Sequence, residues 1–334
     1  MPFGLKKIKP REKAAFRSPS SEFEKPEESP VRVSKAGLIA LHQQAEGLSL
    51  RTVKIRATQG GQYLSPFKGR GMEFDEVRLY QPGDDARTLD WRVTARTGKP
   101  HTKLFREERE RSVLFWVDYR APMFFATRGL FKSVMAARAA ALLAWSAVQH
   151  GDRIGGLIFS EALHHEMRPQ RGKKGVLHFI SNLVEHPAWQ GEAGEKDSGA
   201  AAAEALLRLR RVARPGSLIF LIGDFRAIEG EAQSHLAQLA RSNDVVMLFL
   251  YDPLEQALPP PGFYRVRNAS KALTLDTRDA AFRASYAENF QRRHEALKAL
   301  CRRNRIFHLP CASADNLLQT LQRGLGLGFK SGAA

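Results

Sequence analysis

Residues 112–118 read SVLFWVD, and residues 217–225 read SLIFLIGDF. Each is a short apolar run with an aspartate at or near its end, which is typical of a strand buried on both faces of a parallel sheet. Amphipathic helical patterns separate and follow these runs, at residues 131–149, 172–185, 200–212, 231–241 and 280–302. Strands that alternate with helices predict an α/β fold, in which a mainly parallel sheet carries helices on both faces.

Further strands are expected along the same part of the chain. Residues 162–168 predict an edge strand that pairs with the strand at 153–160. A hairpin is expected after the proline-rich break at residues 259–262. The remaining expected segments are strands at 245–251 and 306–309, and the two hairpin strands at 264–266 and 273–275.

The two ends of the chain predict tails beside capped helices. Residues 1–34 mix charged residues, Ser and Pro with few apolar residues, so we expect a disordered tail. Ser34 is expected to cap a short helix that stops at Gly47. Ser313 is expected to cap a final helix that reaches Gln322, before a short tail at residues 329–334.

The chain carries a strong positive charge. Its 334 residues include 52 Lys and Arg against 35 Asp and Glu, a formal net charge of +17. Such a charge attracts polyanions, so nucleic acid, anionic lipid and an acidic protein are the partner classes to consider. A hydrophobic content of 43% is typical of a globular protein rather than a disordered one.

No targeting segment or disulfide framework is expected. The charged residues 1–13 are not followed by an apolar segment, and the longest dense apolar stretch, 134–148, is interrupted by Arg138. We therefore expect a cytoplasmic protein. Cys301 and Cys311 are too few for a disulfide framework and lack zinc-ligand spacing, which predicts ordinary reduced thiols.

Residues 69–108 read GRGMEFDEVRLYQPGDDARTLDWRVTARTGKPHTKLFREE, and they carry the most specific motif of the sequence. This stretch resembles the signature of the domain of unknown function 58 family, a group of bacterial proteins in which the signature precedes a von Willebrand A-like domain. The resemblance implies a von Willebrand A-like, Rossmann-like domain at residues 112–328, after an N-terminal helix and a charged subdomain at 35–111. The matching residues are Gly71, Glu73, Phe74, Arg78, Tyr80, Gly83, Asp84, Arg87, Asp90, Trp91, Ala95, Arg96, Thr97, Phe105 and Glu108.

The residue types in this signature have a physical interpretation of their own. Residues 81–84 (QPGD) place Pro and Gly as a type II turn requires. Arginines alternate with carboxylates, which predicts a compensating ion-pair network with Trp91 available for stacking. The network either fixes the subdomain against the sheet or binds a partner. Catalysis by these residues is the least favoured alternative.

The resemblance also implies positions for a metal-ion-dependent adhesion site, which uses Asp-x-Ser-x-Ser, a Thr and a later Asp. Asp118 and Asp224 match the acidic positions, whereas Arg120 and Pro122 stand in place of the two serines. Residues 197–201 contain no Thr. Two ligands of five are too few, and a guanidinium repels a cation, so we expect a degenerate site without a metal or other cofactor.

Arg120 could replace the missing cation. If Asp118 and Asp224 end adjacent strands, their carboxylates repel each other unless a positive charge lies between them. Arg120 is two residues from Asp118 and offers five hydrogen-bond donors. The alternative is that Arg120 points into solvent.

The resemblance implies a non-enzymatic adaptor, an accessory factor of a MoxR-type AAA+ ATPase in maturation or assembly of client proteins. No Ser-His-Asp or Cys-His arrangement has a supporting local motif, so neither an enzymatic activity nor a small-molecule substrate is expected. The alternative is a basic protein that binds nucleic acid or an anionic membrane surface. Because the basic residues are scattered over helices and are not interleaved with aromatic residues, the adaptor is favoured.

Overall fold

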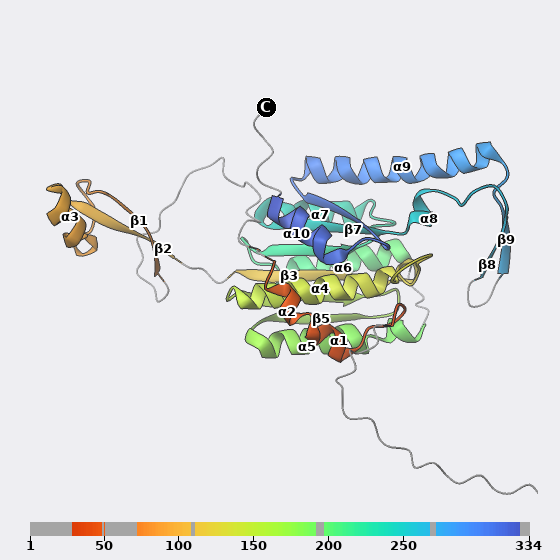
Figure 1. Ribbon diagram of the computed structural model, residues 1–334, viewed down its shortest axis with the longest axis horizontal. Coiled ribbons are helices and arrows are strands. Elements are labelled where there is room, and N and C mark those ends of the chain that lie inside the picture. The colour runs from red at the N-terminus through yellow and green to blue at the C-terminus, as the bar shows by residue number, and fades with distance from the viewer. Residues whose placement is uncertain are drawn as a thin grey trace, which may run out of the picture.

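A six-stranded sheet lies at the centre of the computed structural model, which describes residues 29–48, 50, 72–107, 111–191, 197–267 and 272–327 (Figure 1). Only one edge strand, β5, runs antiparallel to its neighbour within this sheet. The predicted α/β fold with a mainly parallel sheet is therefore confirmed. In sheet order the strands are β10 (Phe307–Ala312), β7 (Asp244–Tyr251), β6 (Leu218–Gly223), β3 (Ser112–Asp118), β4 (Arg153–Phe159) and β5 (His164–Arg171).

Helices cover both faces of the sheet. Alternate residues of β3 point to opposite faces, so that Phe115 packs in one core and Trp116 in the other. Figure 1 looks onto the face that holds the Phe115 core. Its helices are α1 (Lys35–Ala40), α2 (His42–Ala45), α4 (Lys132–Gln149), α5 (Gly172–Glu185) and α10 (Leu317–Leu327). The Trp116 core is covered by α6 (Ser198–Val212), α7 (Glu231–Ser242) and α9 (Ala280–Arg303).

The central helix α4 is the most deeply buried of these helices. Its sequence is rich in alanine, which has the highest helix propensity and leaves the backbone free to pack closely on the sheet. All residues from Lys132 to Ala147 are buried except Arg138. A lysine at the first position of such a helix is unusual, because a buried ammonium requires a partner.

Smaller elements extend from this α/β layer structure. The signature segment forms an antiparallel pair, β1 (Met72–Leu79) with β2 (His101–Glu107). Between these strands lie the short helices η1 (Ala86–Thr88) and α3 (Trp91–Thr97). The predicted hairpin is present as β8 (Phe263–Arg267) with β9 (Ala272–Asp276). The remaining short helices are η2 (Ala121–Met123), η3 (Pro187–Gln190) and α8 (Pro253–Gln256).

Two predictions about the chain ends need correction. Ser313 does not cap α10: its hydroxyl donates to a carboxylate oxygen of Asp252 at 2.6 Å, and the helix begins only at Leu317. Part of the predicted tail is packed, since the Pro30 carbonyl accepts from the Phe131 N–H at 2.9 Å and Val33 is buried. The rest of that tail, residues 1–28, lies outside the described residues, as do residues 328–334.

Other predictions about single residues agree with the structure. Ser34 caps α1, with its hydroxyl accepting from the Gly37 N–H at 3.0 Å. Cys301 and Cys311 are free and buried, and burial raises the pKa of each thiol to about 12. Over the part of the chain that the structure describes, we find no helix with the length and apolarity needed to cross a bilayer.

Candidate functional site

The candidate site lies at the carboxyl ends of β3 and β6, where the strand order reverses. From β3 the sheet grows through β4 toward one edge, and from β6 it grows through β7 toward the other. Doubly wound sheets bind their ligands in the crevice at this point. Asp118 ends β3, and Asp224 directly follows the last residue of β6. The fold thus brings two of the predicted site residues to its ligand-binding edge.

Arg120 lies between these two aspartates. Its Nε donates to Oδ1 of Asp118 at 2.9 Å and one Nη donates to Oδ2 at 2.6 Å, which is a bidentate ion pair. The same Nη lies 3.8 Å from a carboxylate oxygen of Asp224. The side chains of Arg120 and Asp118 are 1% and 0% exposed, so the pair is closed to solvent.

The remaining donors of Arg120 reach two other loops. Its second Nη donates to the carbonyl of Ser198 at 2.8 Å and to the carbonyl of Arg226 at 3.0 Å. Ser198, the first residue of α6, lies in the 197–201 segment that the family resemblance aligns with a metal-ligating Thr, and its hydroxyl also accepts from Arg120. One guanidinium therefore joins the ends of β3 and β6 to the start of α6.

A second cation supports Asp224 from the opposite side. Lys132, at the start of α4, is fully buried, with its Nζ 3.3 Å from Asp224 and 2.7 Å from Glu255. Arg226 pairs with the same two carboxylates at 3.2 and 2.6 Å from the partly exposed rim. The unusual buried lysine of α4 thus has two carboxylate partners.

The crevice holds a balanced set of charges. Three cations, Arg120, Lys132 and Arg226, face three carboxylates, those of Asp118, Asp224 and Glu255. We call these six residues the charge cluster. A buried cluster of this kind is stable only when each member is paired and hydrogen-bonded. Each member has at least one partner of opposite charge, so the cluster fills the crevice with the chain's own groups.

A neighbouring carboxylate anchors the cluster to β7. Asp252 follows β7 and accepts from the Thr127 hydroxyl at 2.6 Å and from the Thr127 N–H at 2.8 Å. It also forms a capping box with Glu255, whose side chain accepts from the Asp252 N–H. Glu255 is therefore held in place by α8 while it binds Lys132.

The electrostatic effects on the two aspartates differ in direction. Burial raises the pKa of Asp118, and although Arg120 opposes this effect, the pKa stays above its ordinary value. Burial alone would also raise the pKa of Asp224, but Lys132, the Arg226 N–H and Arg120 together hold it below its ordinary value. Despite its own burial, Arg120 has a raised pKa, because Asp118 and Asp224 stabilise the charged guanidinium.

Backbone geometry makes room for the cluster. A Cβ at Gly223 would lie 2.8 Å from the Cβ of Asp118 and 3.0 Å from its Oδ2, so only glycine leaves that carboxylate in place. Phe225 and Ala227 adopt positive φ values of 53° and 56°, which non-glycine residues rarely do. Such strain concentrates at sites where the surrounding structure fixes the backbone.

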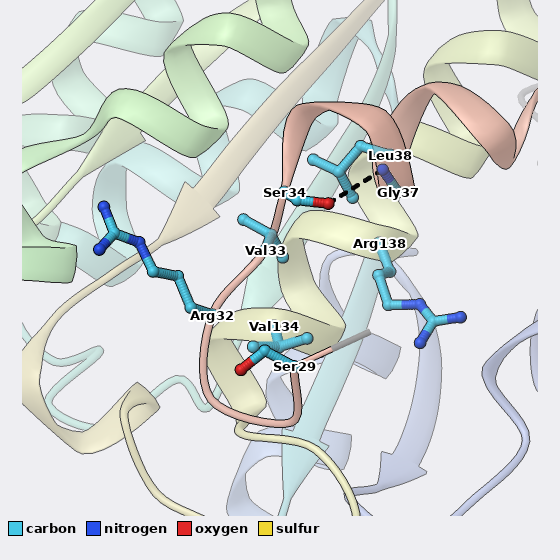
Figure 2. A pocket seen from close by; sticks show the side chains of 8 residues that line it. All are labelled: Ser29, Arg32, Val33, Ser34, Gly37, Leu38, Val134 and Arg138. Atoms are coloured by element: carbon cyan, nitrogen blue, oxygen red, sulfur yellow. Dashed lines mark hydrogen bonds between the residues drawn. The ribbon is translucent and has the colours of Figure 1, made fainter. Parts of the chain in front are cut away.

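Two cavities lie in the described part of the α/β domain. One borders the cluster at Asp224 and is lined by Phe225, Phe249, Arg293 and Leu297. The other lies between the N-terminal segment and α4, where Val33, Leu38 and Val134 form its apolar wall. Figure 2 shows that in this second cavity the Ser34 hydroxyl faces the Gly37 N–H, as a helix cap does.

The structure brings together only part of the predicted signature network. Asp84 pairs with Arg78 at 2.7 Å and accepts from the Gln81 N–H at 2.9 Å. These contacts close the expected turn, in which Gly83 has a φ of 106° and Tyr80 donates to the Asp84 carbonyl. The backbone hydrogen bond from Gln81 is the main reason that the pKa of Asp84 is lowered.

The other signature residues are more exposed than the predicted network requires. Asp90 uses its carboxylate to cap α3, where it accepts from the N–H groups of Arg92 and Val93 at 3.0 and 3.1 Å. Trp91 is 71% exposed, and Arg87 and Arg96 are exposed as well. The expectation of a compensating network is wrong for these arginines, because the nearby aspartates bind backbone N–H groups instead. Glu108 lies outside the described residues.

Several residues of the charge cluster were not predicted. Lys132, Arg226 and Glu255 lack any link to the implied metal positions, and Ser198 belongs to the 197–201 segment, whose only stated feature is the absence of Thr. Two sequence features could have pointed to them: a lone lysine at the start of an apolar helix, and the D-P-L-E sequence at 252–255, which is a capping-box pattern.

Pro122 lies in η2 and is not a member of the cluster. Among the described residues, no group of three or more His, Cys, Asp or Glu side chains is arranged to hold a metal ion.

The fold and the site define a doubly wound α/β protein whose crevice is filled by an internal charge cluster. The chain belongs to the family described as proteins of unknown function DUF58, whose family model matches residues 76–296. Uncharacterized proteins of Mycobacterium bovis and Mycobacterium tuberculosis are 30% identical over 246 residues, which cover 72% of this chain and 76% of theirs.

Solved structures with a looser similarity include two from Bacteroides. The conserved hypothetical protein BatB of Bacteroides thetaiotaomicron is 14% identical with a TM-score of 0.40, over 66% of this chain and 100% of that one. An aerotolerance-related membrane protein of Bacteroides fragilis is 16% identical with a TM-score of 0.41, over 65% of this chain and 99% of that one.

Proposed function

We propose that this chain is a cytoplasmic, non-enzymatic adaptor with a von Willebrand A-like domain, and that it docks a MoxR-type AAA+ ATPase and a client protein. In this proposal the metal-ion-dependent adhesion site is degenerate, and Arg120 takes the place of the cation. The domain would then recognise partners through its protein surface and not through a bound metal.

The observation that carries the proposal is the position of Arg120. Its guanidinium binds Asp118 and approaches Asp224 at the edge where a doubly wound domain binds ligands. A metal ion at that position would meet a fixed positive charge, which opposes its binding. Because Lys132 and Arg226 already pair with the other carboxylates, no uncompensated negative charge remains in the cluster to attract a cation.

The same arrangement argues against catalysis in the crevice. A hydrolase would need a nucleophile within hydrogen-bond reach of a general base. The carboxylates of the charge cluster are engaged by arginine and lysine, and the nearby Ser198 hydroxyl accepts from Arg120. These groups hold the loops in place and are not available to activate a substrate.

Affinity purification of the full chain from its native host tests the proposal. With ATP present, a MoxR-type AAA+ ATPase should co-elute in stoichiometric amount, and it should bind the purified chain directly. ADP in place of ATP serves as the comparison for nucleotide dependence. Recovery of bulk nucleic acid or lipid without any AAA+ ATPase would contradict the proposal and favour the polyanion-binding alternative.

A further inference from the structure

Helix α3 of the signature segment presents one exposed side. At 100° per residue, Trp91, Arg92, Ala95 and Arg96 fall within one arc of the helix, and all four are exposed. Val93 and Thr94 lie on the opposite arc and are half-buried, with the Thr94 hydroxyl accepting from the His101 N–H at 3.0 Å. We call the exposed residues of α3, together with Arg87 of η1, the signature face.

The arginines of the signature face carry an uncompensated charge. None of Arg87, Arg92 and Arg96 forms an ion pair with a carboxylate that the structure describes. The nearby carboxylates contact groups other than these arginine side chains: Asp85 accepts from the Arg87 N–H at 2.9 Å, and Asp90 caps α3 and lies 3.6 Å from the Nζ of Lys103. Because three arginines stand against these two aspartates, the face keeps a net positive charge.

Trp91 adds a large apolar group to this basic face. At 71% exposure it is the most exposed large hydrophobic side chain among the described residues. Trp116 and Trp145, by contrast, are 0% and 4% exposed. Tryptophan and arginine are the residues that contribute most often to binding energy at protein interfaces, where they are enriched at the centre.

We infer that the signature face is a docking site for an acidic protein surface, one that offers a pocket for the indole of Trp91 and carboxylates for the arginines. This inference rests on the proposed adaptor function and names the chemistry of its partner. Arg92 and Arg96 are one helical turn apart, a spacing of about 5–6 Å at Cβ, at which each guanidinium can bind a carboxylate bidentately. Complementary charge and the indole together specify the partner.

Nucleic acid and membrane fit this face less well. Single-strand binders stack successive bases on several aromatic side chains, whereas α3 offers only Trp91. A membrane-surface helix needs a continuous apolar face, and Trp91 and Ala95 alone are too small a patch.

The experiment begins with the free full-length chain. Acrylamide quenching of tryptophan fluorescence should show a readily quenched component that disappears in W91F. If that component is not reduced in W91F, Trp91 is not exposed and the inference is overturned. The chain is then titrated with a synthetic peptide of alternating Glu and Leu, with a (dT)16 oligonucleotide, and with phosphatidylserine vesicles. The peptide should protect Trp91 from quenching at low salt, and stronger protection by either other probe would overturn the choice of partner.

The ATPase that co-purifies with the chain provides the second measurement. W91A should raise the Kd at least about 30-fold, which is the usual effect of a hot spot. R92E/R96E should do the same, and R92K/R96K should raise the Kd by a smaller factor because lysine cannot bind bidentately. Matched controls are F282A, another exposed aromatic, and R302E/R303E on α9, which should change the Kd less than twofold.

The outcomes separate the two proposals. If the ATPase binds and W91A and R92E/R96E bind as tightly as the wild type, the docking inference is overturned while the adaptor function stands. If no ATPase binds but the acidic peptide protects Trp91, the adaptor function fails and the inference about the surface is supported. Because these side chains are exposed, unchanged melting temperatures of the variants verify that the fold is intact.

Discussion

The guanidinium of Arg120 donates to both carboxylate oxygens of Asp118, at 2.9 and 2.6 Å, although only one residue separates them in the chain. Asp224 lies 3.8 Å from the same Nη that binds Asp118, so one buried cation compensates two buried carboxylates. Two such carboxylates without a charge between them would repel each other, and one would take up a proton. The ion pair therefore stabilises the edge where β3 and β6 end.

Removal of Arg120 should destabilise the fold strongly. Arg120→Ser leaves the carboxylate of Asp118 buried without its partner, which typically costs about 3–5 kcal/mol. Urea unfolding at pH 7 measures this loss. The control is Arg208→Ser, which removes a half-exposed ion pair with Glu204 and should cost about 0.5 kcal/mol or less. Equal losses in the two variants would show that the buried pair has no special role.

Divalent metal should not affect the stability of the wild type. Arg120 and Lys132 already supply positive charge beside Asp118 and Asp224. The melting temperature should therefore be the same in millimolar Mg²⁺ and in EDTA, because a ligand that binds only the folded state would raise it. A reproducible rise with Mg²⁺ but not with K⁺ at matched ionic strength would contradict the assignment of Arg120 as the replacement for the cation.

Gly223 should tolerate no side chain while Asp118 is present. In Gly223→Ala, the new methyl group would lie 2.8 Å from the Cβ of Asp118 and displace it from Arg120. We expect a loss of about 1–3 kcal/mol in the free energy of unfolding, as for an overpacked core. In an Asp118→Gly background the same substitution should cost clearly less, because the methyl group then meets neither the Cβ nor the carboxylate of residue 118. Additive losses in the double variant would exclude this steric explanation.

The signature turn gives a prediction that differs from the sequence-based one. From the sequence, loss of either Arg87 or Asp90 should lower the stability of a buried network. In the structure Arg87 is exposed, so Arg87→Ala should leave the melting temperature unchanged. Asp90 caps α3, so Asp90→Ala should reduce the protection of the α3 amides against hydrogen exchange, by about 0.5–2 kcal/mol. Loss of stability in Arg87→Ala would restore the network interpretation.

Much of the fold could be predicted because local patterns agree with the tertiary structure. The SVLFWVD run at 112–118 becomes β3 without a shift of either boundary, since all but its first residue are buried. The α9 pattern likewise extends only one residue beyond its predicted end. Ser313 shows where such reasoning fails. Its hydroxyl could cap a helix locally, but Asp252, 61 residues away in sequence, binds it instead.

The candidate site could be predicted only in part for the same reason. Asp118 and Asp224 were predicted because the family resemblance implies acidic positions after two apolar runs, and such runs are a local signal. The pairing of Lys132 with Glu255 joins residues 123 positions apart, and no local pattern links them. In the signature, the numbers of arginines and aspartates suggested mutual ion pairs. Asp90 instead caps a helix, and this role depends on the local backbone geometry, which a count of charged residues does not include.

Because His186 is buried, the free energy of unfolding should decrease as the pH falls below neutrality. His186 is 1% exposed, and burial, assisted by the nearby His165, lowers its pKa to about 4. The unfolded chain has an ordinary histidine pKa near 6.5, so between pH 6.5 and 4 the unfolded state binds a proton that the folded state does not. The contribution of neutral His186 to the free energy of unfolding is therefore fully present above pH 6.5. About 3 kcal/mol is lost as the pH falls from 6.5 to 4.

The variant His186→Asn isolates this contribution. The Nδ1 of His186 accepts from the Ala188 N–H at 3.2 Å at the start of η3, and an asparagine oxygen can accept the same hydrogen bond. The variant cannot titrate in this range, so its free energy of unfolding should fall less than that of the wild type between pH 6.5 and 4. Urea unfolding at half-unit pH steps measures the difference. Parallel curves for the two proteins would mean that His186 is protonated in the folded state and that its burial has no effect on stability.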